Sequence, residues 1–201
     1  DQLDSLFQKA SPELIEARSL QQRTDTKFVV HAQNLPKILD RLRGECAAII
    51  NQGGLLADYE NLYFDTEDFR CLRDHQRGLR PRFKVRYRHH NSRRMSFLEV
   101  KRKSGDQSTT KARLATDFMN ETPFVEHQAF VEAHSPLKSA DLAPSLRIRF
   151  ERLSLLSLQS NERVTMDQGL TFSGGGRSKG WENLCIIEVK QARFPEASGP
   201  F

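Results

Sequence analysis

The fold of this chain is decided by Arg82-Phe-Lys-Val-Arg-Tyr-Arg88, by the polar residues His89 to Ser92, and by Phe97-Leu-Glu-Val-Lys-Arg-Lys103. The two outer runs predict paired antiparallel strands joined by a turn. Because side chains along a strand point alternately to opposite faces, every second residue shares a surface. One face carries Lys84, Arg86, Arg88, Glu99, Lys101 and Lys103. The other carries Phe83, Val85, Tyr87, Leu98 and Val100, which can pack against a covering layer.

The charged face of this hairpin has two interpretations. Charged alternation is typical of the solvated face of an antiparallel sheet, where the charges carry no functional meaning. If the same face lines the inside of a closed sheet, the repulsion between its cations requires an anion, and a polyanion such as a phosphate chain fits. Repetition of the pattern on other strands decides between the two.

The pattern recurs in other predicted strands. Charged or polar residues stand two apart at Arg23, Asp25 and Lys27, at Arg163, Thr165 and Asp167, and at Glu188 and Lys190. The positions between them are largely apolar, as at Val164, Met166, Ile187 and Val189. The sheet is therefore expected to be apolar outside and charged inside, the reverse of a small barrel with a packed interior. Such an interior must hold water, ions or a charged ligand, since unpaired charges are costly to bury dry.

Strands dominate the predicted elements. They are expected at 23–30, 55–65, 82–88, 97–103, 111–118, 146–158, 163–172 and 183–190. Short helices are predicted at 12–18 with Ser11 as N-cap, between Asn34 and Gly44, at 67–76, and at 123–133 after Thr122. Residues 1–201 are expected to form a single domain with a strand core and a few peripheral helices. Closing the sheet into a barrel would remove its edges.

The composition is that of a globular protein with one sizeable core, at 201 residues, 37% hydrophobic and 28% charged. The net charge of +5 favours anionic partners. No apolar run approaches the length of a membrane segment. Cys46, Cys71 and Cys185 are widely spaced, which predicts reduced, buried thiols of a cytoplasmic protein. The chain starts at Asp1 without Met or a signal peptide, as a trimmed sequence does.

Six short motifs resemble, in their order, those of VTC-domain proteins, the polyphosphate polymerase branch of the triphosphate tunnel metalloenzymes. The motifs are Arg23-x-Asp-x-Lys27-Phe, Tyr63-Phe-Asp65, Lys84-Val-Arg86-Tyr-Arg88, Leu98-Glu99-Val-Lys101, Arg163-x-Thr-x-Asp167 and Ile187-Glu188-Val-Lys190. No single motif is specific, and the specificity lies in the order of all six. The resemblance spans residues 11–190. It implies an α+β fold, mainly antiparallel β, in which an eight-stranded tunnel-like β-barrel with peripheral helices holds a tri- or polyphosphate.

The resemblance also implies roles for individual residues. Phosphate oxygens would be bound by Lys27, Lys84, Arg86, Lys101, Arg152, Arg163 and Lys190, with Arg88 and Lys103 joining from the same faces. The catalytic residues would be Lys27, Arg86, Lys101, Arg152 and Glu188. Glu188 would be the metal carboxylate, with Glu99 and Asp167 assisting directly or through water, and Mn²⁺ or Mg²⁺ suits such an oxygen-rich site. Several cations and one metal supply the charge stabilisation that phosphoryl transfer needs.

Three departures from the family pattern change these expectations. Arg23 and Asp25 stand where a related branch has two Glu, so a second metal is not expected. Phe150 precedes Arg152 where the eukaryotic polymerase has a Tyr, which removes a hydroxyl donor. The family's C-terminal helix, with its Ser-Lys pair, has no counterpart before Phe201. A C-terminally shortened form would bind phosphate yet turn over poorly.

The predicted function is metal-dependent binding of tri- or polyphosphate, with polyphosphate synthesis by phosphoryl transfer from a nucleoside triphosphate such as ATP as the preferred activity. Hydrolysis of triphosphate or of a nucleoside triphosphate is the second interpretation. A non-catalytic module that binds polyphosphate or another anion is the third. Nucleic acid is not an expected partner, because an exposed basic patch with stacking aromatics is not evident. Protein partners are not predicted.

Several other residues have ordinary structural explanations. Gly174 to Gly180 lacks the spacing of a phosphate-binding loop and predicts a mobile hairpin tip. His89 and His90 are expected to be solvated in a turn. Asp65 is predicted to cap the helix that follows it. Arg147 and Arg149 lie on the face opposite Arg152 and are either outer-surface cations or, if a bulge shifts the register, lining residues.

Overall fold

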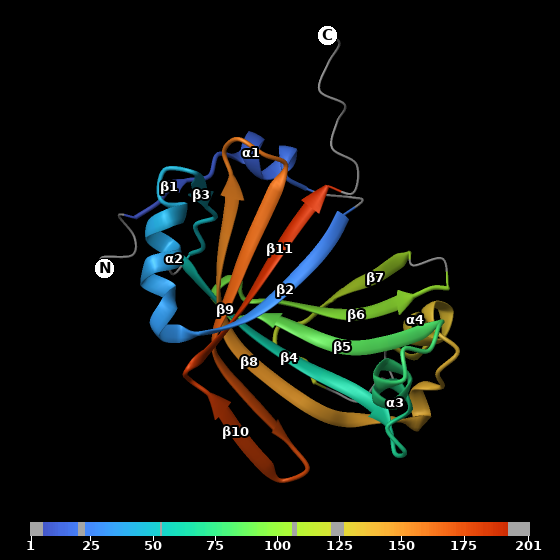
Figure 1. Cartoon of the computed structure of the whole chain (residues 1–201). Coiled ribbons are helices and arrows are strands. Elements are labelled where there is room, and N and C mark those ends of the chain that lie inside the picture. Colours follow the sequence, from blue (N-terminus) through green and yellow to red (C-terminus); the bar gives the residue numbers. More distant parts are fainter. Residues whose placement is uncertain (1–5, 20–22, 53, 106–107, 122–126, 193–201) are drawn as a thin grey trace. The chain divides into compact units, whose positions relative to one another are not determined.

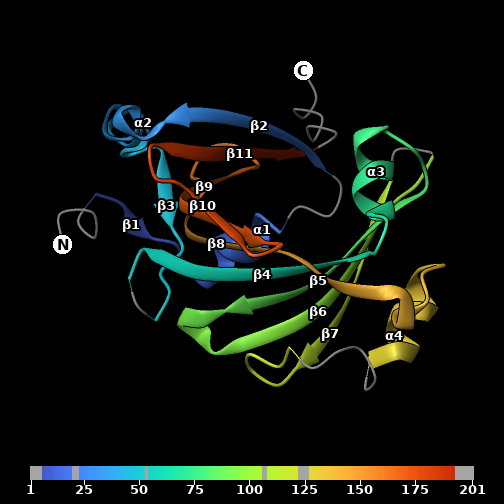
Figure 2. The same cartoon turned by 90° about the horizontal axis from the view of Figure 1, so that it is seen from below.

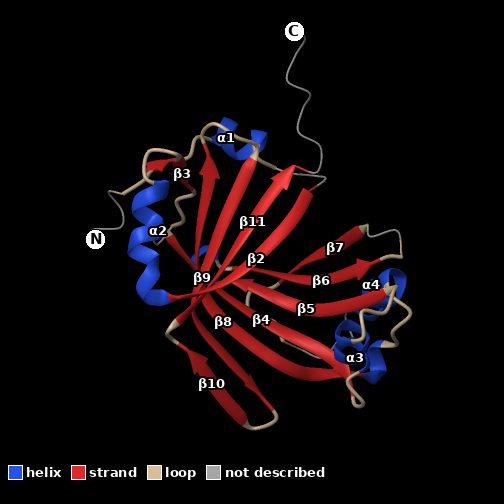
Figure 3. Cartoon of the chain, in the orientation of Figure 1, coloured by secondary structure: helices blue, strands red, loops and turns tan. Residues whose placement is uncertain are grey.

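A computed structural model describes residues 6–19, 23–52, 54–105, 108–121 and 127–192 of the chain. Strands make up most of it, and the helices are short (Figure 3). The hydrogen-bonded strand order is β2-β11-β9-β8-β4-β5-β6-β7. The pairs β2–β11, β11–β9, β4–β5, β5–β6 and β6–β7 are antiparallel, so the predicted α+β class with a mainly antiparallel sheet is confirmed. The path has the expected eight strands, but it does not close into the predicted barrel among the described residues.

The chain divides into two compact units. Unit 1 comprises Asp1–Asp58, Phe150–Leu170 and Gly180–Phe201, and unit 2 comprises Tyr59–Arg149 and Thr171–Lys179. The strands β4 (Leu56–Thr66), β8 (Leu142–Ser157), β9 (Glu162–Gly174) and β10 (Arg177–Trp181) contribute residues to both. The single domain expected for residues 1–201 stays a prediction.

Unit 1 is built on the neighbouring strands β2 (Arg23–His31), β11 (Leu184–Ala192), β9 and β8. Strand β3 (Cys46–Ala48) pairs with β8, and β1 (Gln8–Lys9) pairs in parallel with β3. Helix α1 (Pro12–Ala17) is capped by Ser11, as predicted. Helix α2 (Leu35–Leu42) lies beside β3 (Figure 1), and its Leu39 joins a core with Leu155, Met166 and Ile187.

Unit 2 continues from β8 through β4, β5 (Arg82–His90), β6 (Met95–Lys103) and β7 (Thr109–Thr116), which lie side by side (Figure 2). Helices α3 (Arg70–Gln76) and α4 (Gln128–His134) pack against β5 and β6. Cys71 of α3 and Val131 of α4 join Val85, Tyr87 and Leu98 in the core. The predicted division of the hairpin into an apolar and a charged face is therefore correct, and the helices cover the apolar face.

The structure corrects the local prediction for the two histidines. Strand β5 continues through His89 and His90, and the turn is the short 3₁₀ helix Asn91–Arg93. His89 is fully buried and its Nδ1 lies 2.6 Å from the Ser96 hydroxyl. The prediction that these histidines are solvated is wrong for His89, because the helix-covered side of the sheet extends to the end of the strand.

Helix boundaries also differ from the predictions. Helix α3 begins at Arg70 rather than at residue 67, and its predicted cap Asp65 is confirmed. The Asp65 carboxylate accepts hydrogen bonds from the backbone N–H groups of Thr66 and Cys71, both at 2.8 Å, and of Leu72 at 3.0 Å. Helix α4 is described from Gln128, and the start predicted after Thr122 lies outside the described residues.

The glycine-rich stretch forms the turn of the β9–β10 hairpin. Gly175 and Gly176 have φ angles of 55° and 72°, which favour glycine. Gly174 approaches β8 so closely that a Cβ atom would lie 2.4 Å from the Ser145 carbonyl oxygen. The glycines are thus explained by the turn and by strand packing, and the mobility of this tip stays a prediction.

The three cysteines are buried free thiols, as predicted. Within the described part of the chain, no helix combines the length and the apolar character needed to cross a lipid bilayer.

Candidate functional site

The charged face of unit 2 is organised around Glu99 on β6. This face is set by register: Glu99 is the Cα partner of Arg86 on β5 and of Arg113 on β7. The Glu99 side chain is 2% exposed. Its apolar neighbours Leu98 and Val100 are buried on the opposite face, which anchors the strand and fixes the direction of the carboxylate. A buried carboxylate of this kind requires partners of opposite charge.

Four cations surround the two carboxylate oxygens of Glu99. Oε2 accepts hydrogen bonds from Nε and Nη2 of Arg86 at 2.9 and 2.7 Å, and Nε of Arg88 lies 3.8 Å away. Oε1 lies 2.5 Å from Nζ of Lys111 and 3.2 Å from Nη2 of Arg113. Both oxygens are therefore engaged by cations, and the cluster keeps an excess of positive charge.

The electrostatics of this cluster follow from burial and mutual contact. Burial alone would raise the pKa of Glu99, but Arg86, Arg88 and Lys111 outweigh it and lower the pKa to about 2. Burial lowers the pKa of Lys111 to about 8, against the opposing attraction of Glu99. Glu99 is thus ionised throughout the physiological range, whereas Lys111 titrates close to it.

Side chains of β4 also orient Arg86 and Arg88. Tyr63 is the Cα partner of Arg86, and its hydroxyl accepts a hydrogen bond from Nη1 of Arg86 at 2.8 Å. Asn61 is the Cα partner of Arg88, and its Oδ1 accepts from Nε of Arg88 at 3.0 Å. Burial would raise the pKa of Tyr63, but Arg86 and Arg88 lower it. Fixed guanidinium groups are suited to binding planar oxyanions such as phosphate.

The remaining predicted residues of unit 2 lie further along the same face. Lys84 and Lys101 are direct Cα partners across β5 and β6, and Lys103 is the partner of Arg82. Lys111 is in turn the partner of Lys101 on β7. The structure therefore brings the predicted hairpin cations together on one surface.

Sequence reasoning missed four members of the unit 2 face. These are Asn61, Tyr63, Lys111 and Arg113. The signal for Lys111 and Arg113 was present, because they stand two apart in a predicted strand, as the recognised cations do. Tyr63 stood in a quoted motif without a role assigned to it, and Asn61 could be found only from the register of β4 with β5.

The charged face of unit 1 is organised around Glu188 on β11. Glu188 is the Cα partner of Lys27 on β2 and of Thr165 on β9, and Lys190 is the partner of Asp25 and Arg163. The Glu188 carboxylate forms ion pairs with the ammonium groups of Lys27 and Lys190. The intervening residues Ile187 and Val189 pack into the core of unit 1, so the charged side chains share the other face.

Arg152 on β8 adds a bidentate pair to this face. Its Nε and Nη2 donate to the two oxygens of Asp167 at 2.5 and 2.7 Å. The guanidinium carbon also lies 5.1 Å from the ring centroid of Phe150, the residue that stands where a Tyr was expected. Phe150 thus supports Arg152 through its ring and offers no hydroxyl.

Ion pairing sets the charge states of unit 1. Burial would raise the pKa of Glu188, but Lys190 and Lys27 lower it to about 2. Burial lowers the pKa of Lys190, and Glu188 opposes this shift. Lys27 is the more accessible of the two lysines to a ligand, because 59% of its side chain is exposed, against 14% for Lys190. An anionic ligand can therefore compete with Glu188 for these ammonium groups.

Arg147 and Arg149 do not belong to either charged face. Both bind Glu60, which is 1% exposed on the helix-covered side of β4, and Nε of Arg149 lies 2.5 Å from its Oε2. Arg147 also donates to both oxygens of Glu121 at 2.6 and 2.7 Å. Arg147 and Arg149 therefore do not line the charged face of unit 2, which leaves the interpretation as cations of the other surface.

The carboxylates Glu188, Asp167 and Glu99 could hold a metal ion only together with ligands from outside the protein. Among the described residues, no group of three or more His, Cys, Asp and Glu side chains lies close enough together to hold a metal ion. Magnesium, however, commonly binds through one or two carboxylates and completes its shell with substrate phosphates and water. Glu188 and Asp167, each 13% exposed, suit such a metal if it arrives with a phosphate ligand. Glu99 suits it less, because its oxygens already contact four cations.

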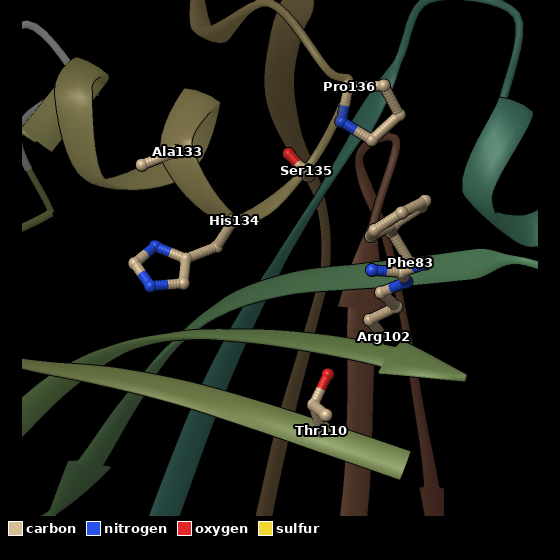
Figure 4. A pocket seen from close by; sticks show the side chains of 7 residues that line it. All are labelled: Phe83, Arg102, Thr110, Ala133, His134, Ser135 and Pro136. Atoms are coloured by element: carbon tan, nitrogen blue, oxygen red, sulfur yellow. The ribbon is translucent and has the colours of Figure 1, made fainter. Parts of the chain in front are cut away.

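A pocket of about 430 Å³ in unit 2 lies away from these charges (Figure 4). It is lined by Phe83 and Arg102 of the sheet, Thr110 of β7 and His134 of α4, among others. Phe83 and Arg102 alternate with Lys84 and Lys101 along their strands, so the pocket opens on the opposite face of the sheet. None of the predicted site residues lines it.

Comparison with known families identifies the chain. The sequence profile described as the VTC domain matches residues 22–197, which is most of the chain. The chain belongs to the VTC domain family. This match confirms the resemblance to VTC-domain proteins carried by the six motifs. No curated protein matches the chain.

Solved structures show the same fold at low sequence identity. A candidate adenylate cyclase from Bacillus halodurans matches the VTC domain with a TM-score of 0.55 and 13% identity, over 84% of this chain and 80% of that one. A candidate adenylate cyclase from Vibrio parahaemolyticus matches with a TM-score of 0.48 and 12% identity, over 90% and 81% of the two chains. At this identity the first likeness shows the fold alone, and the second adds no argument.

Proposed function

We propose that this VTC domain binds tri- or polyphosphate on its charged sheet faces and extends polyphosphate by taking the γ-phosphate of a nucleoside triphosphate. The proposed phosphate ligands are Lys27, Lys84, Arg86, Arg88, Lys101, Lys103, Arg152, Arg163 and Lys190. Lys111 and Arg113 join them from β7. The phosphate chemistry expected of the family supports this substrate class, and the arrangement of charges in each unit supports these residues.

The observation that carries the proposal is the surplus of positive charge around the buried carboxylate of Glu99. On that face of β5, β6 and β7, all of which the structure describes, Glu99 is the one carboxylate among many Lys and Arg side chains. Repulsion between close, partly buried cations is costly, and a bound polyanion removes that cost. A solvated structural face would not need Arg86 to be oriented by both Glu99 and Tyr63.

The proposed roles follow from the chemistry of phosphoryl transfer. Arg86 and Arg152 would hold phosphate oxygens through paired N–H groups, and Lys27 and Lys101 would supply point charges. Such fixed cations stabilise the charge that develops on the transferred group and orient it for in-line attack. A divalent Mn²⁺ or Mg²⁺ held by Glu188 and phosphate oxygens would neutralise further charge when bound.

The test is to incubate the protein with ATP and Mn²⁺ and to resolve the products on a gel. Long phosphate chains support synthesis, release of free phosphate favours hydrolysis, and ligand binding without turnover indicates a binding module. Failure to bind tripolyphosphate in calorimetry would refute all three versions.

Lys101→Ala and Arg102→Ala form a matched pair for this assay, because the two residues are neighbours on opposite faces of β6. Lys101→Ala is expected to weaken tripolyphosphate binding by about 1.5–3 kcal/mol, as for loss of a hydrogen bond to a charged group. Arg102→Ala should bind normally. Glu188→Gln should lose turnover while it retains anion binding, and unchanged turnover would remove Glu188 from the proposed metal site.

A further inference from the structure

Thr165 occupies the centre of the charged face of unit 1. It lies on β9 between Arg163 and Asp167, and its Cα partner on β11 is Glu188. Its neighbours Val164 and Met166 pack into the core on the other side of the strand. Thr165 therefore points to the charged side, yet it is only 2% exposed.

The hydroxyl of Thr165 is buried without a hydrogen-bond partner among the residues that the structure describes. Acceptors are close along the sheet, but they are already engaged. The Glu188 oxygens contact Lys27 and Lys190, and the Asp167 oxygens accept from Arg152. A buried hydroxyl without a partner is unusual and costs stability, so it calls for an explanation.

We propose that the Thr165 hydroxyl is a hydrogen-bond donor for an oxygen of the phosphate ligand on the face of unit 1. This inference rests on the proposed function and adds a neutral ligand group to the cations. A phosphate oxygen would supply the hydrogen-bond acceptor that the Thr165 hydroxyl lacks. The positive charges of Lys27, Lys190 and Arg152 on the same face would attract the phosphate. Phosphate oxygens that take over the lysine contacts of Glu188 would come within reach of the hydroxyl.

The variants Thr165→Val and Thr165→Ser separate this role from a structural one. Valine keeps the shape of threonine and removes the hydroxyl, so thermal unfolding without ligand should occur at the same or a higher temperature. Calorimetry with sodium tripolyphosphate should show binding about tenfold weaker, the effect of one hydrogen bond to a charged group. Thr165→Ser keeps the hydroxyl and should bind within about twofold of the unmodified protein, since the loss of one methyl removes no donor.

Thr116 provides a matched control within the same chain. Its hydroxyl is also buried without a partner among the described residues, but it lies in unit 2 opposite Ser96, on the side of β7 away from Lys111 and Arg113. Thr116→Val should show the same tolerance in ligand-free unfolding and no change in tripolyphosphate binding.

The outcomes that overturn the inference are distinct from those that overturn the proposed function. If Thr165→Val unfolds at a clearly lower temperature without ligand, the hydroxyl has a structural partner such as a buried water. If Lys27→Ala weakens binding and Thr165→Val does not, the phosphate site stands and the role of Thr165 is refuted. If the unmodified protein does not bind tripolyphosphate, the proposed function and the inference both fail.

Discussion

The contacts of Glu99 indicate that it acts by placing cations rather than by holding a metal. Its two oxygens contact Arg86, Arg88, Lys111 and Arg113, and the carboxylate itself is buried. Removing one partner of a buried ion pair leaves the other charges uncompensated, which typically costs several kcal/mol. The cluster thus depends on Glu99 until a phosphate ligand supplies negative charge of its own.

Glu99→Gln is expected to lower the free energy of unfolding by about 3 kcal/mol in the absence of ligand. Tripolyphosphate should recover most of this loss, because its charge replaces that of the carboxylate. Urea unfolding with and without tripolyphosphate measures both effects. Equal destabilisation under the two conditions would contradict this account. Glu188→Gln should lose turnover, whereas Glu99→Gln should need the same Mn²⁺ concentration for turnover as the unmodified protein.

At the scale of single elements, helix α3 depends on one carboxylate that the sequence identified. Asp65 is 5% exposed and accepts two backbone N–H groups in the first turn of the helix, those of Cys71 and Leu72, and a third from Thr66. The helix runs only from Arg70 to Gln76, so it is too short to be stable without its cap and its packing. Cys71, buried in the core of unit 2, is held in place by this arrangement.

Asp65→Ala is expected to destabilise the protein by about 2 kcal/mol, the upper end of the range for the loss of a helix cap, because the released N–H groups are buried. The local consequence is exposure of the Cys71 thiol. Mass spectrometry after treatment with a thiol reagent should show faster labelling of Cys71, while Cys46 and Cys185 of unit 1 serve as internal references. Labelling of all three at one common rate would indicate global unfolding instead.

Helices and strands were predictable from the sequence where a local sequence pattern alone determines them. The two-residue alternation found the strands and most cations of both charged faces, and the N-cap Ser11 found α1. The rule failed where a tertiary contact decided. His89 is buried by the covering layer, although the sequence around it is typical of a turn. The start of α3 is set by hydrogen bonds from the N–H groups of Cys71 and Leu72 to Asp65. Thr165 was visible in a motif, but its lack of a partner could be seen only in the structure.

At the scale of the whole molecule, both charged faces respond to acid in the same direction. Glu99 and Glu188 each have a pKa lowered to about 2 from the ordinary value of 4.5. A carboxylate whose pKa is lowered by folding stabilises the protein above its unfolded pKa and loses this effect as the pH falls toward its folded pKa. The ion pairs of both units therefore weaken over the same window.

The free energy of unfolding is expected to fall as the pH drops from about 4.5 to about 2. Urea titrations across this range measure the dependence. Glu188→Gln and Glu99→Gln should each make the curve shallower, because the substituted residue no longer takes up a proton. A curve of unchanged steepness in both variants would show that other carboxylates carry the acid sensitivity.

The ion pairs of Glu60 have a consequence for where a polyanion can settle. Arg147 and Arg149 carry the same charge as the cations of the charged faces, yet they are paired with Glu60 and Glu121 on their own side of the sheet. The paired carboxylates offset the attraction of Arg147 and Arg149 for a phosphate chain. The net attraction of unit 2 for a polyanion is therefore on the opposite face of the sheet. The side on which a polyanion binds is thus set partly by the ion pairing of these arginines. A count of all basic residues would overestimate the number available to bind phosphate.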